Sequence, residues 1–187
     1  MILGLDISTS IIGWCVFFNS QVVDYGYCDL TDIDSLFDKA NVFSREIRLV
    51  LEKHKITEFA VEMPIKKFSI GKSSASTIFT LCAFNFAVCR EIRNITGTDP
   101  LYVYRQSSLA IAGIKTKKTD LTGSYSQRQK QKKEIVRKYC ELKFKNVVWD
   151  KNKNGNSQPW CYDIADSILI AQAAETCPTK FTRDMRQ

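Results

Sequence analysis

The sequence contains little histidine, little glycine and no long hydrophobic run. Its 187 residues include one histidine, His54, and no Cys-x-x-Cys pair, so a zinc site is not expected. Eight glycines are too few for the phosphate-binding loops of an actin-like ATPase or sugar kinase, which also opens with an apolar strand and an aspartate. No hydrophobic run approaches the roughly 18 residues of a membrane helix. We therefore expect no zinc, no nucleotide cofactor and no membrane span.

Positive charge is in excess. Lysine and arginine outnumber the acids 27 to 20, which gives a net charge of +7. This excess favours a polyanionic partner, nucleic acid first, although a solvated basic face is the alternative. The seven cysteines are an odd number in mostly apolar surroundings, and the N-terminus lacks the features of a signal peptide. We expect an intracellular protein in a reducing compartment, which includes the cytoplasm, the nucleoid, an organelle or a viral factory.

The order of the predicted elements indicates one α/β domain over residues 1–187. Three short-linked apolar strands are expected first, followed by strands and helices in alternation. His54, between two lysines, is expected at the exposed end of a helix, and the polar tail from about residue 176 is expected to fray. The predicted strands cover residues 2–7, 11–18, 21–28, 56–63 and 101–104, and the predicted helices cover 35–54, 74–93, 106–112 and 160–175, with another after residue 133.

Four carboxylates stand at positions where a charge is costly. Asp6 interrupts the first apolar strand, Glu62 ends the fourth, and Asp163 and Asp166 share one side of the last helix beside its buried stripe. Taken alone, Asp6 could cap a turn, and the helical pair could stabilise a helix N-terminus. If the first and fourth strands are neighbours and the last helix crosses their ends, all four converge. Such a set suits Mg²⁺ or Mn²⁺, and two ions about 4 Å apart support phosphodiester hydrolysis.

Two basic segments and one apolar helix suggest binding surfaces. Residues 115–133 hold seven cations against one acid, which predicts a mobile arm that contacts phosphates, with a solvated linker as the alternative. The helix at about 74–93 is apolar most of the way round, so it is sandwiched in the core or shared with a second subunit. The predicted DNA-contacting residues are Lys115, Lys117, Lys118, Arg128, Lys130, Lys132 and Lys133 of the arm, with Lys66, Lys67 and Lys72 of a loop before the apolar helix.

The acidic motifs resemble those of the RuvC-type Holliday junction resolvases, within the RNase H-like (retroviral integrase) superfamily. The matching segments are Gly4-Leu-Asp-Ile-Ser-Thr9 with Gly13-Trp14, then Val61-Glu-Met63, then Asp163-Ile-Ala-Asp-Ser167. The resemblance implies an RNase H-like α/β fold, with a mixed five-stranded sheet of three antiparallel N-terminal strands and then parallel strands, flanked by helices. Bacterial members usually show Asp-Pro-Gly at the first motif. The Asp-Ile-Ser-Thr of this chain is closer to phage, viral or organellar members.

The resemblance also implies an activity and a set of residue roles. Asp6, Glu62, Asp163 and Asp166 correspond to the catalytic, metal-binding carboxylates, with two Mg²⁺ per site and Mn²⁺ as a substitute. Lys132 or Lys133 resembles the basic residue near the scissile phosphate. Phe68, in the loop after Glu62, corresponds to the DNA-contacting aromatic that bacterial members place as a wedge at the junction centre. The implied enzyme is an endonuclease that resolves four-way junctions, as a homodimer formed through the helix at about 74–93, and leaves 5′-phosphate ends.

Two alternatives to a resolvase stay open within the same fold. One is a nuclease for another substrate, such as branched DNA, a fork or an RNA–DNA hybrid. The other is a non-catalytic module that binds nucleic acid.

Overall fold

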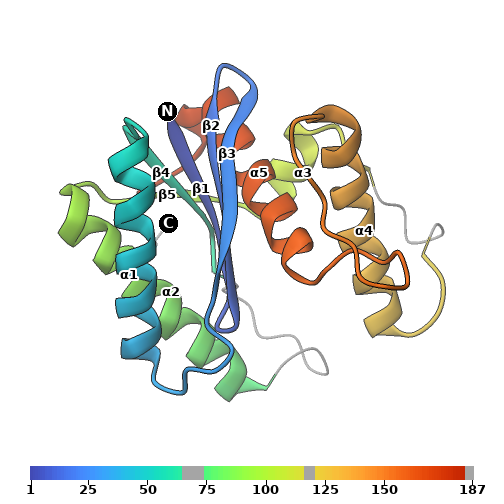
Figure 1. Cartoon of the computed structure of the whole chain (residues 1–187), viewed down its shortest axis with the longest axis horizontal. Coiled ribbons are helices and arrows are strands. Elements are labelled where there is room, and N and C mark those ends of the chain that lie inside the picture. The colour runs from blue at the N-terminus through green and yellow to red at the C-terminus, as the bar shows by residue number, and fades with distance from the viewer. Residues whose placement is uncertain (65–73, 116–120, 184–187) are drawn as a thin grey trace.

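A mixed five-stranded sheet forms the centre of the protein. The computed structural model describes residues 1–64, 74–115 and 121–183 (Figure 1). Strands β1 (Ile2–Ile7), β2 (Ile11–Phe18) and β3 (Gln21–Asp29) form an antiparallel meander, and β4 (Glu58–Glu62) and β5 (Leu101–Val103) add in parallel on the other side of β1. The strand order is β3-β2-β1-β4-β5, so the predicted sheet and the predicted pairing of the first and fourth strands are confirmed.

The two faces of the sheet are covered by different helices. Leu3 and Leu5 of β1 pack in a core that includes residues of α1 (Leu36–Lys53) and α2 (Ala75–Thr96). Because side chains alternate along a strand, Asp6 and the β4 residue Glu62 project from the opposite face. That face is covered by α5 (Trp160–Thr176), as Figure 1 shows. Both strand carboxylates therefore point toward the last helix.

The remaining helices extend the α5 side of the molecule. Helix α4 (Tyr125–Lys143) packs on α5, with Val136 and Cys140 among the buried residues of that contact. Helix α3 (Arg105–Ile111) follows β5 almost directly. With the sheet on one side and α4 on the other, α5 is buried along most of its length. The prediction that the last helix crosses the strand ends is wrong, because α5 lies against the face of β1 and β2.

The basic arm predicted for residues 115–133 is helical from Tyr125 onward, so the predicted loop is wrong for that half. Ser124 caps the helix by accepting a bond from the Gln127 backbone, while the Gln127 side chain accepts one from the Ser124 backbone. Lys, Arg and Gln also favour helix. Arg128, Lys130, Lys132 and Lys133 lie on α4 and Lys115 lies before it, whereas Lys66, Lys67, Phe68, Lys72, Lys117 and Lys118 lie outside the described residues.

Two further predictions need correction. The predicted fraying of the tail from about residue 176 is wrong as far as Arg183. The tail forms a short 3₁₀ helix, η2 (Pro178–Lys180), buries Phe181 and forms a bridge between Thr182 and Tyr102 of β5. His54 lies at the end of α1 as predicted, but it is not exposed: its Nε2 lies 2.8 Å from an Asp24 carboxylate oxygen on β3, and its side chain is only 16% exposed.

Helix α2 is only partly covered. Phe84, Val88 and Ile92 are buried in the core, whereas Phe79 and Phe86 are 75% and 59% exposed. Within the described ranges, α2 is the one helix long and apolar enough to cross a membrane, although core helices of soluble proteins meet the same criteria. The all-round apolar sequence of α2 therefore reflects both a core face and an exposed face.

All seven cysteines are free, and five of them are buried. Burial raises the pKa of the Cys28 and Cys89 thiols to about 11, so at neutral pH both stay protonated and act as small apolar side chains.

Candidate active site

Asp6 and Glu62 are brought together by strand pairing. Strand β1 runs parallel to β4, with Leu5 paired to Val61, so the next residue along each strand places the two carboxylates at neighbouring positions on the α5 face. On its other side, Asp6 pairs with Gly13 of β2. The sheet thus fixes one half of the site through backbone hydrogen bonds alone.

Two glycines let α5 approach the sheet closely enough to complete the site. A Cβ at Gly13 would lie 2.3 Å from the backbone of Asp163, and a Cβ at Gly4 would lie 2.4 Å from the Ser167 carbonyl oxygen. A side chain at either position would push the helix away. Asp163 and Asp166 are 9% and 4% exposed. These glycines, which belong to the acidic motifs, set the spacing between the strand carboxylates and the helix carboxylates.

Arg105 joins the two halves of the site. Its Nη1 donates to Glu62 Oε2 at 3.2 Å and to Asp166 Oδ2 at 3.1 Å, and its Nη2 donates to Asp166 Oδ1 at 3.2 Å. The two bonds to Asp166 form the bidentate arrangement that a planar guanidinium favours. Arg105 was not among the predicted site residues. It follows parallel strand β5 by two residues, and since β5 pairs with β4, its position at the same sheet edge as Glu62 was a usable signal.

Lys133 supplies a second cation from α4. Its Nζ lies 3.1 Å from Asp163 Oδ1. Of the two lysines predicted to approach the phosphate, Lys133 therefore points into the carboxylate cluster. Arg105 and Lys133 together contact three of the four acids. These two cations offset the charge repulsion expected between Asp163 and Asp166.

The pKa values of the site reflect this balance. Burial, together with the neighbouring charges of Asp166, Glu62 and Asp163, raises the pKa of Asp6 well above its ordinary value. Burial also raises the pKa of Glu62 and Asp163, against the opposing effects of Arg105 and Lys133 respectively. Burial opposes the charge of Lys133, but Asp163 and Asp6 outweigh it and raise the lysine pKa. Asp6 forms no ion pair with either cation, so burial and the neighbouring carboxylates act on it without a direct cationic partner.

The donor set suits a hard divalent ion, because all four candidate ligands are carboxylates and Mg²⁺ prefers oxygen. In this structure, three of the four carboxylates are hydrogen-bonded to Arg105 or Lys133. Among the residues that the structure describes, no three acidic, cysteine or histidine side chains form a ready-made metal cage. A divalent ion would therefore compete with Arg105 and Lys133 for the same oxygens. The assignment of the four carboxylates as metal ligands and catalytic residues stays a prediction.

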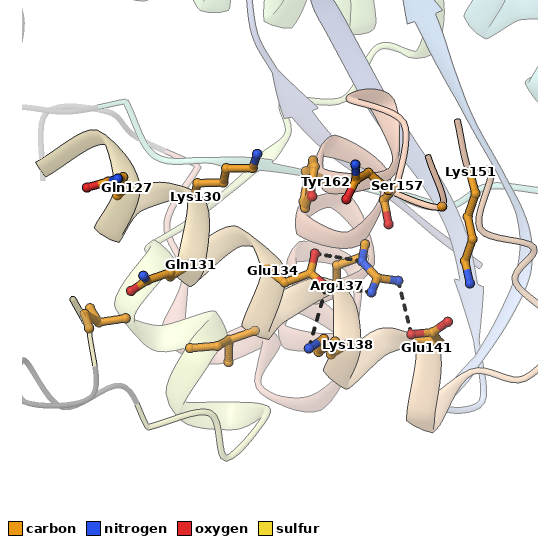
Figure 2. A pocket seen from close by; sticks show the side chains of 14 residues that line it. Gln127, Lys130, Gln131, Glu134, Arg137, Lys138, Glu141, Lys151, Ser157 and Tyr162 are labelled. Carbon is orange, nitrogen blue, oxygen red and sulfur yellow. Dashed lines mark hydrogen bonds and ion pairs between the residues drawn. The ribbon is translucent and has the colours of Figure 1, made fainter. Parts of the chain in front are cut away.

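A hollow of about 680 Å³ lies along α4, away from the carboxylate cluster and against the loop that carries Lys151 and Ser157 (Figure 2). Arg137 crosses it, paired with Glu134 at 2.8 Å and with Glu141 at 3.1 Å. Because glutamates neutralise this arginine, the hollow is less attractive for phosphate than its cations suggest. Lys130, which also lines it, has no ion pair within the described part of the chain.

The fold was compared with known proteins. No protein-family model and no curated protein matches the sequence. Solved structures do match: RuvC of Thermus thermophilus in complex with a Holliday junction substrate (10% identity, TM-score 0.60, 96% of this chain and 94% of that one) and a second Thermus thermophilus RuvC structure (11%, 0.59, 96% and 95%). The yeast mitochondrial Holliday junction resolvase Ydc2 also matches (16%, 0.53, 92% and 76%).

These matches span nearly the whole chain at very low identity, so they bear on the fold. They agree with the five-stranded sheet order and with the resemblance that the acidic motifs carry. One of the three matches is organellar, in line with the departure from the bacterial form at the first motif. The chain has the RNase H-like fold of the RuvC-type Holliday junction resolvases.

Proposed function

We propose that this protein is a divalent-metal-dependent endonuclease that resolves four-way DNA junctions. The observation that carries the proposal is the meeting of four carboxylates with Arg105 and Lys133 on one sheet face, in a fold shared with structures named as resolvases. A non-catalytic relative would have no use for so many mutually repelling buried acids, because each raises the cost of folding.

Asp6, Glu62, Asp163 and Asp166 are the residues that would hold Mg²⁺ or Mn²⁺. When bound, such ions supply an activated water and stabilise the leaving oxygen of a phosphodiester. The chain itself contributes position and charge. Gly4 and Gly13 hold α5 against the sheet, so the carboxylate spacing is fixed before substrate arrives.

Lys133 is suited to contact the scissile phosphate. It is 45% exposed, and it extends from α4 to the edge of the carboxylate cluster. A phosphate at the cluster would offer Lys133 a second anionic partner beside Asp163, and the raised pKa of Lys133 keeps its ammonium charged during that exchange. Arg105, held by three hydrogen bonds, is placed to orient Glu62 and Asp166.

The cations of α4 are suited to hold the DNA backbone outside the site. Arg128 and Lys130 are exposed on the helix that also carries Lys133, so phosphates of one strand could run from the cluster along α4. We assign no base contact to these residues, because contacts to phosphate position DNA without reading its sequence. The predicted contacts at residues 66–72 and 117–118 stay proposals.

A second copy of the chain would pair through α2. Phe79 and Phe86 are large exposed aromatics seven residues apart on a helix whose other face is core, and exposed apolar surface on such a helix can form an interface. Two sites facing symmetric strands would cut a junction in pairs. The cuts would leave 5′-phosphate and 3′-hydroxyl ends.

The proposed location is a reducing compartment inside the cell. The cysteine thiols are free and mostly buried, which is consistent with such a compartment.

The substrate is tested by comparing Mg²⁺-dependent cutting of a four-way junction, a fork, an RNA–DNA hybrid and a linear duplex of matched sequence. The proposal predicts preferential cutting of the junction. Preferential cutting of the hybrid would keep the nuclease and overturn the substrate. Binding of the junction without cutting of any substrate would indicate a non-catalytic module.

A further inference from the structure

A buried ion-pair network lies on the side of α4 that faces the hollow (Figure 2). Its centre is Arg137, which is 5% exposed. The Arg137 Nε and Nη2 donate to the two carboxylate oxygens of Glu134 at 3.0 and 2.8 Å, and Nη1 donates to Glu141 Oε2 at 3.1 Å. Because all three nitrogens of the guanidinium are bonded, Arg137 fixes Glu134 in both distance and orientation.

The network also reaches segments outside α4. Hydrogen bonding by Arg137, and to a smaller extent by Tyr162 of α5, lowers the pKa of Glu134 against the effect of burial, so this carboxylate stays charged at neutral pH. The Arg137 guanidinium lies 5.9 Å from the centre of the Trp149 ring, in the segment that follows α4. Glu134 and Arg137 therefore connect α4 both to α5 and to that segment.

This network lies directly beside the contact between Lys133 and the carboxylate cluster. Glu134 follows Lys133 in α4, and Tyr162 precedes Asp163 in α5. Two neighbouring contacts thus join the same stretches of α4 and α5. One faces the hollow, and in the other Lys133 Nζ lies 3.1 Å from Asp163 Oδ1 at the cluster. Since consecutive helix residues are about 100° apart, a rotation of α4 that displaces Glu134 also displaces Lys133.

Buried apolar residues do not hold the part of α4 that carries Lys133. Val136 is the first buried residue of α4, and no earlier residue of this helix, all of which the structure describes, is buried. Further along the helix, the Cys140 thiol donates to the Ala165 carbonyl oxygen of α5 at 3.6 Å. The position of Lys133 therefore depends on polar contacts, and those that the described residues make to α5 before Val136 come from Lys133 itself and from Glu134.

We propose that Arg137 is a positioning residue: through Glu134 it fixes the first half of α4, and so keeps the Lys133 ammonium at the carboxylate cluster. The inference rests on the proposed function, in which Lys133 contacts the scissile phosphate. Arg137 itself is buried and binds neither DNA nor metal in this role. A cation between two glutamates suits the role because its hydrogen bonds fix a direction, whereas apolar contacts permit sliding.

The first test replaces Arg137 by methionine, which removes the hydrogen bonds and keeps a long side chain. A displacement of about 1 Å can lower the rate of an enzyme about 100-fold, so Arg137→Met should cut roughly 10- to 100-fold more slowly at saturating junction and Mg²⁺. Its affinity for the junction should equal that of wild type, because Arg137 contacts no DNA. Lys138→Met is the matched control and should cut at the wild-type rate, since Lys138 also lies near Glu134, at 4.0 Å, but is 64% exposed.

A double-mutant cycle separates positioning from a general loss of structure. Lys133→Met should cut roughly 100- to 1000-fold more slowly than wild type, which a single-turnover assay with excess protein still measures. If Arg137 acts through Lys133, adding Arg137→Met to Lys133→Met should slow cutting by less than about 2-fold further. Should Arg137→Met fail to fold, Glu134→Gln, which keeps the shape of the side chain, takes its place in the same cycle with a smaller expected loss.

Three results would overturn the inference alone. These are an unchanged cutting rate in Arg137→Met, an equal fall on adding Arg137→Met to wild type and to Lys133→Met, and a Lys133→Met protein that cuts at the wild-type rate. Failure of the wild-type protein to cut any junction would instead overturn the proposed function, and the inference with it; that failure is seen before any variant is made.

Discussion

Replacing Arg105 by glutamine should destabilise the metal-free protein and strengthen its response to divalent metal. The substitution removes the cation that contacts Glu62 and Asp166, whose side chains are 26% and 5% exposed. Removing one partner of a fully buried pair costs about 3–5 kcal/mol. Arg105 is 38% exposed, so solvent screens part of the interaction, and we expect a loss of about 1–3 kcal/mol. For a chain of this size that corresponds to a fall in Tm of roughly 2–12 °C.

The response to metal shows whether Arg105 only stabilises the carboxylates or also competes with metal for their oxygens. Metal at 100 times its Kd stabilises a folded protein by about 2.7 kcal/mol. If Arg105 occupies the oxygens that metal would use, the rise in Tm on adding Mg²⁺ or Mn²⁺ should be larger for Arg105→Gln than for wild type. Arg93→Gln is the control, because Arg93 pairs with Asp99 at 2.9 Å where both are exposed. Equal metal shifts in wild type and Arg105→Gln, or an unchanged metal-free Tm, would refute the reasoning.

Two further predictions follow from the charges. Because the pKa of Asp6 is raised in the folded state, its ionisation opposes folding above the ordinary value of 3.8. Metal-free Asp6→Asn should therefore be more stable than wild type at neutral pH, with a difference that shrinks as pH falls toward 4 in thermal unfolding; a less stable Asp6→Asn would contradict the conclusion that the charge of Asp6 opposes folding. Replacing both Lys130 and Lys132 by alanine should weaken junction binding and reduce its salt slope by up to about 0.9 for each phosphate that is no longer neutralised. Lys53→Ala, at the end of α1 on the other sheet face, serves as the control, and a slope unchanged in the double variant would remove α4 from the DNA path.

The strand pattern predicted the antiparallel meander, because the first three apolar strands are joined by short links. The mixed five-stranded sheet was implied by the resemblance of the acidic motifs, and the pairing of the first and fourth strands was a condition that the structure meets. The spacing of Asp163 and Asp166 predicted that both lie on one side of the last helix. The short links and the helical spacing are local in sequence, so a periodicity argument captures them.

The missed features depend on tertiary contacts or on charge balance. The charge of the lysines and the arginine after Tyr125 suggests a solvated loop, although the capping box at Ser124 and the helix propensity of Gln and Lys favour helix there. Arg105 has no motif of its own, and its role emerges only when β5 pairs with β4. The packed tail depends on Thr182 meeting Tyr102, 80 residues apart in sequence, which no local pattern indicates.

The most direct test of the account is to map Mg²⁺-dependent cuts on a synthetic four-way junction labelled in turn on each strand, with wild type and Asp6→Asn side by side. The account predicts paired cuts at symmetric positions on two opposing strands, with 5′-phosphate ends, and no cuts from Asp6→Asn, which should still bind the junction. Cutting by Asp6→Asn at the wild-type rate, or a wild-type protein that binds junctions and never cuts them, would contradict the central claim that these carboxylates form a nuclease centre.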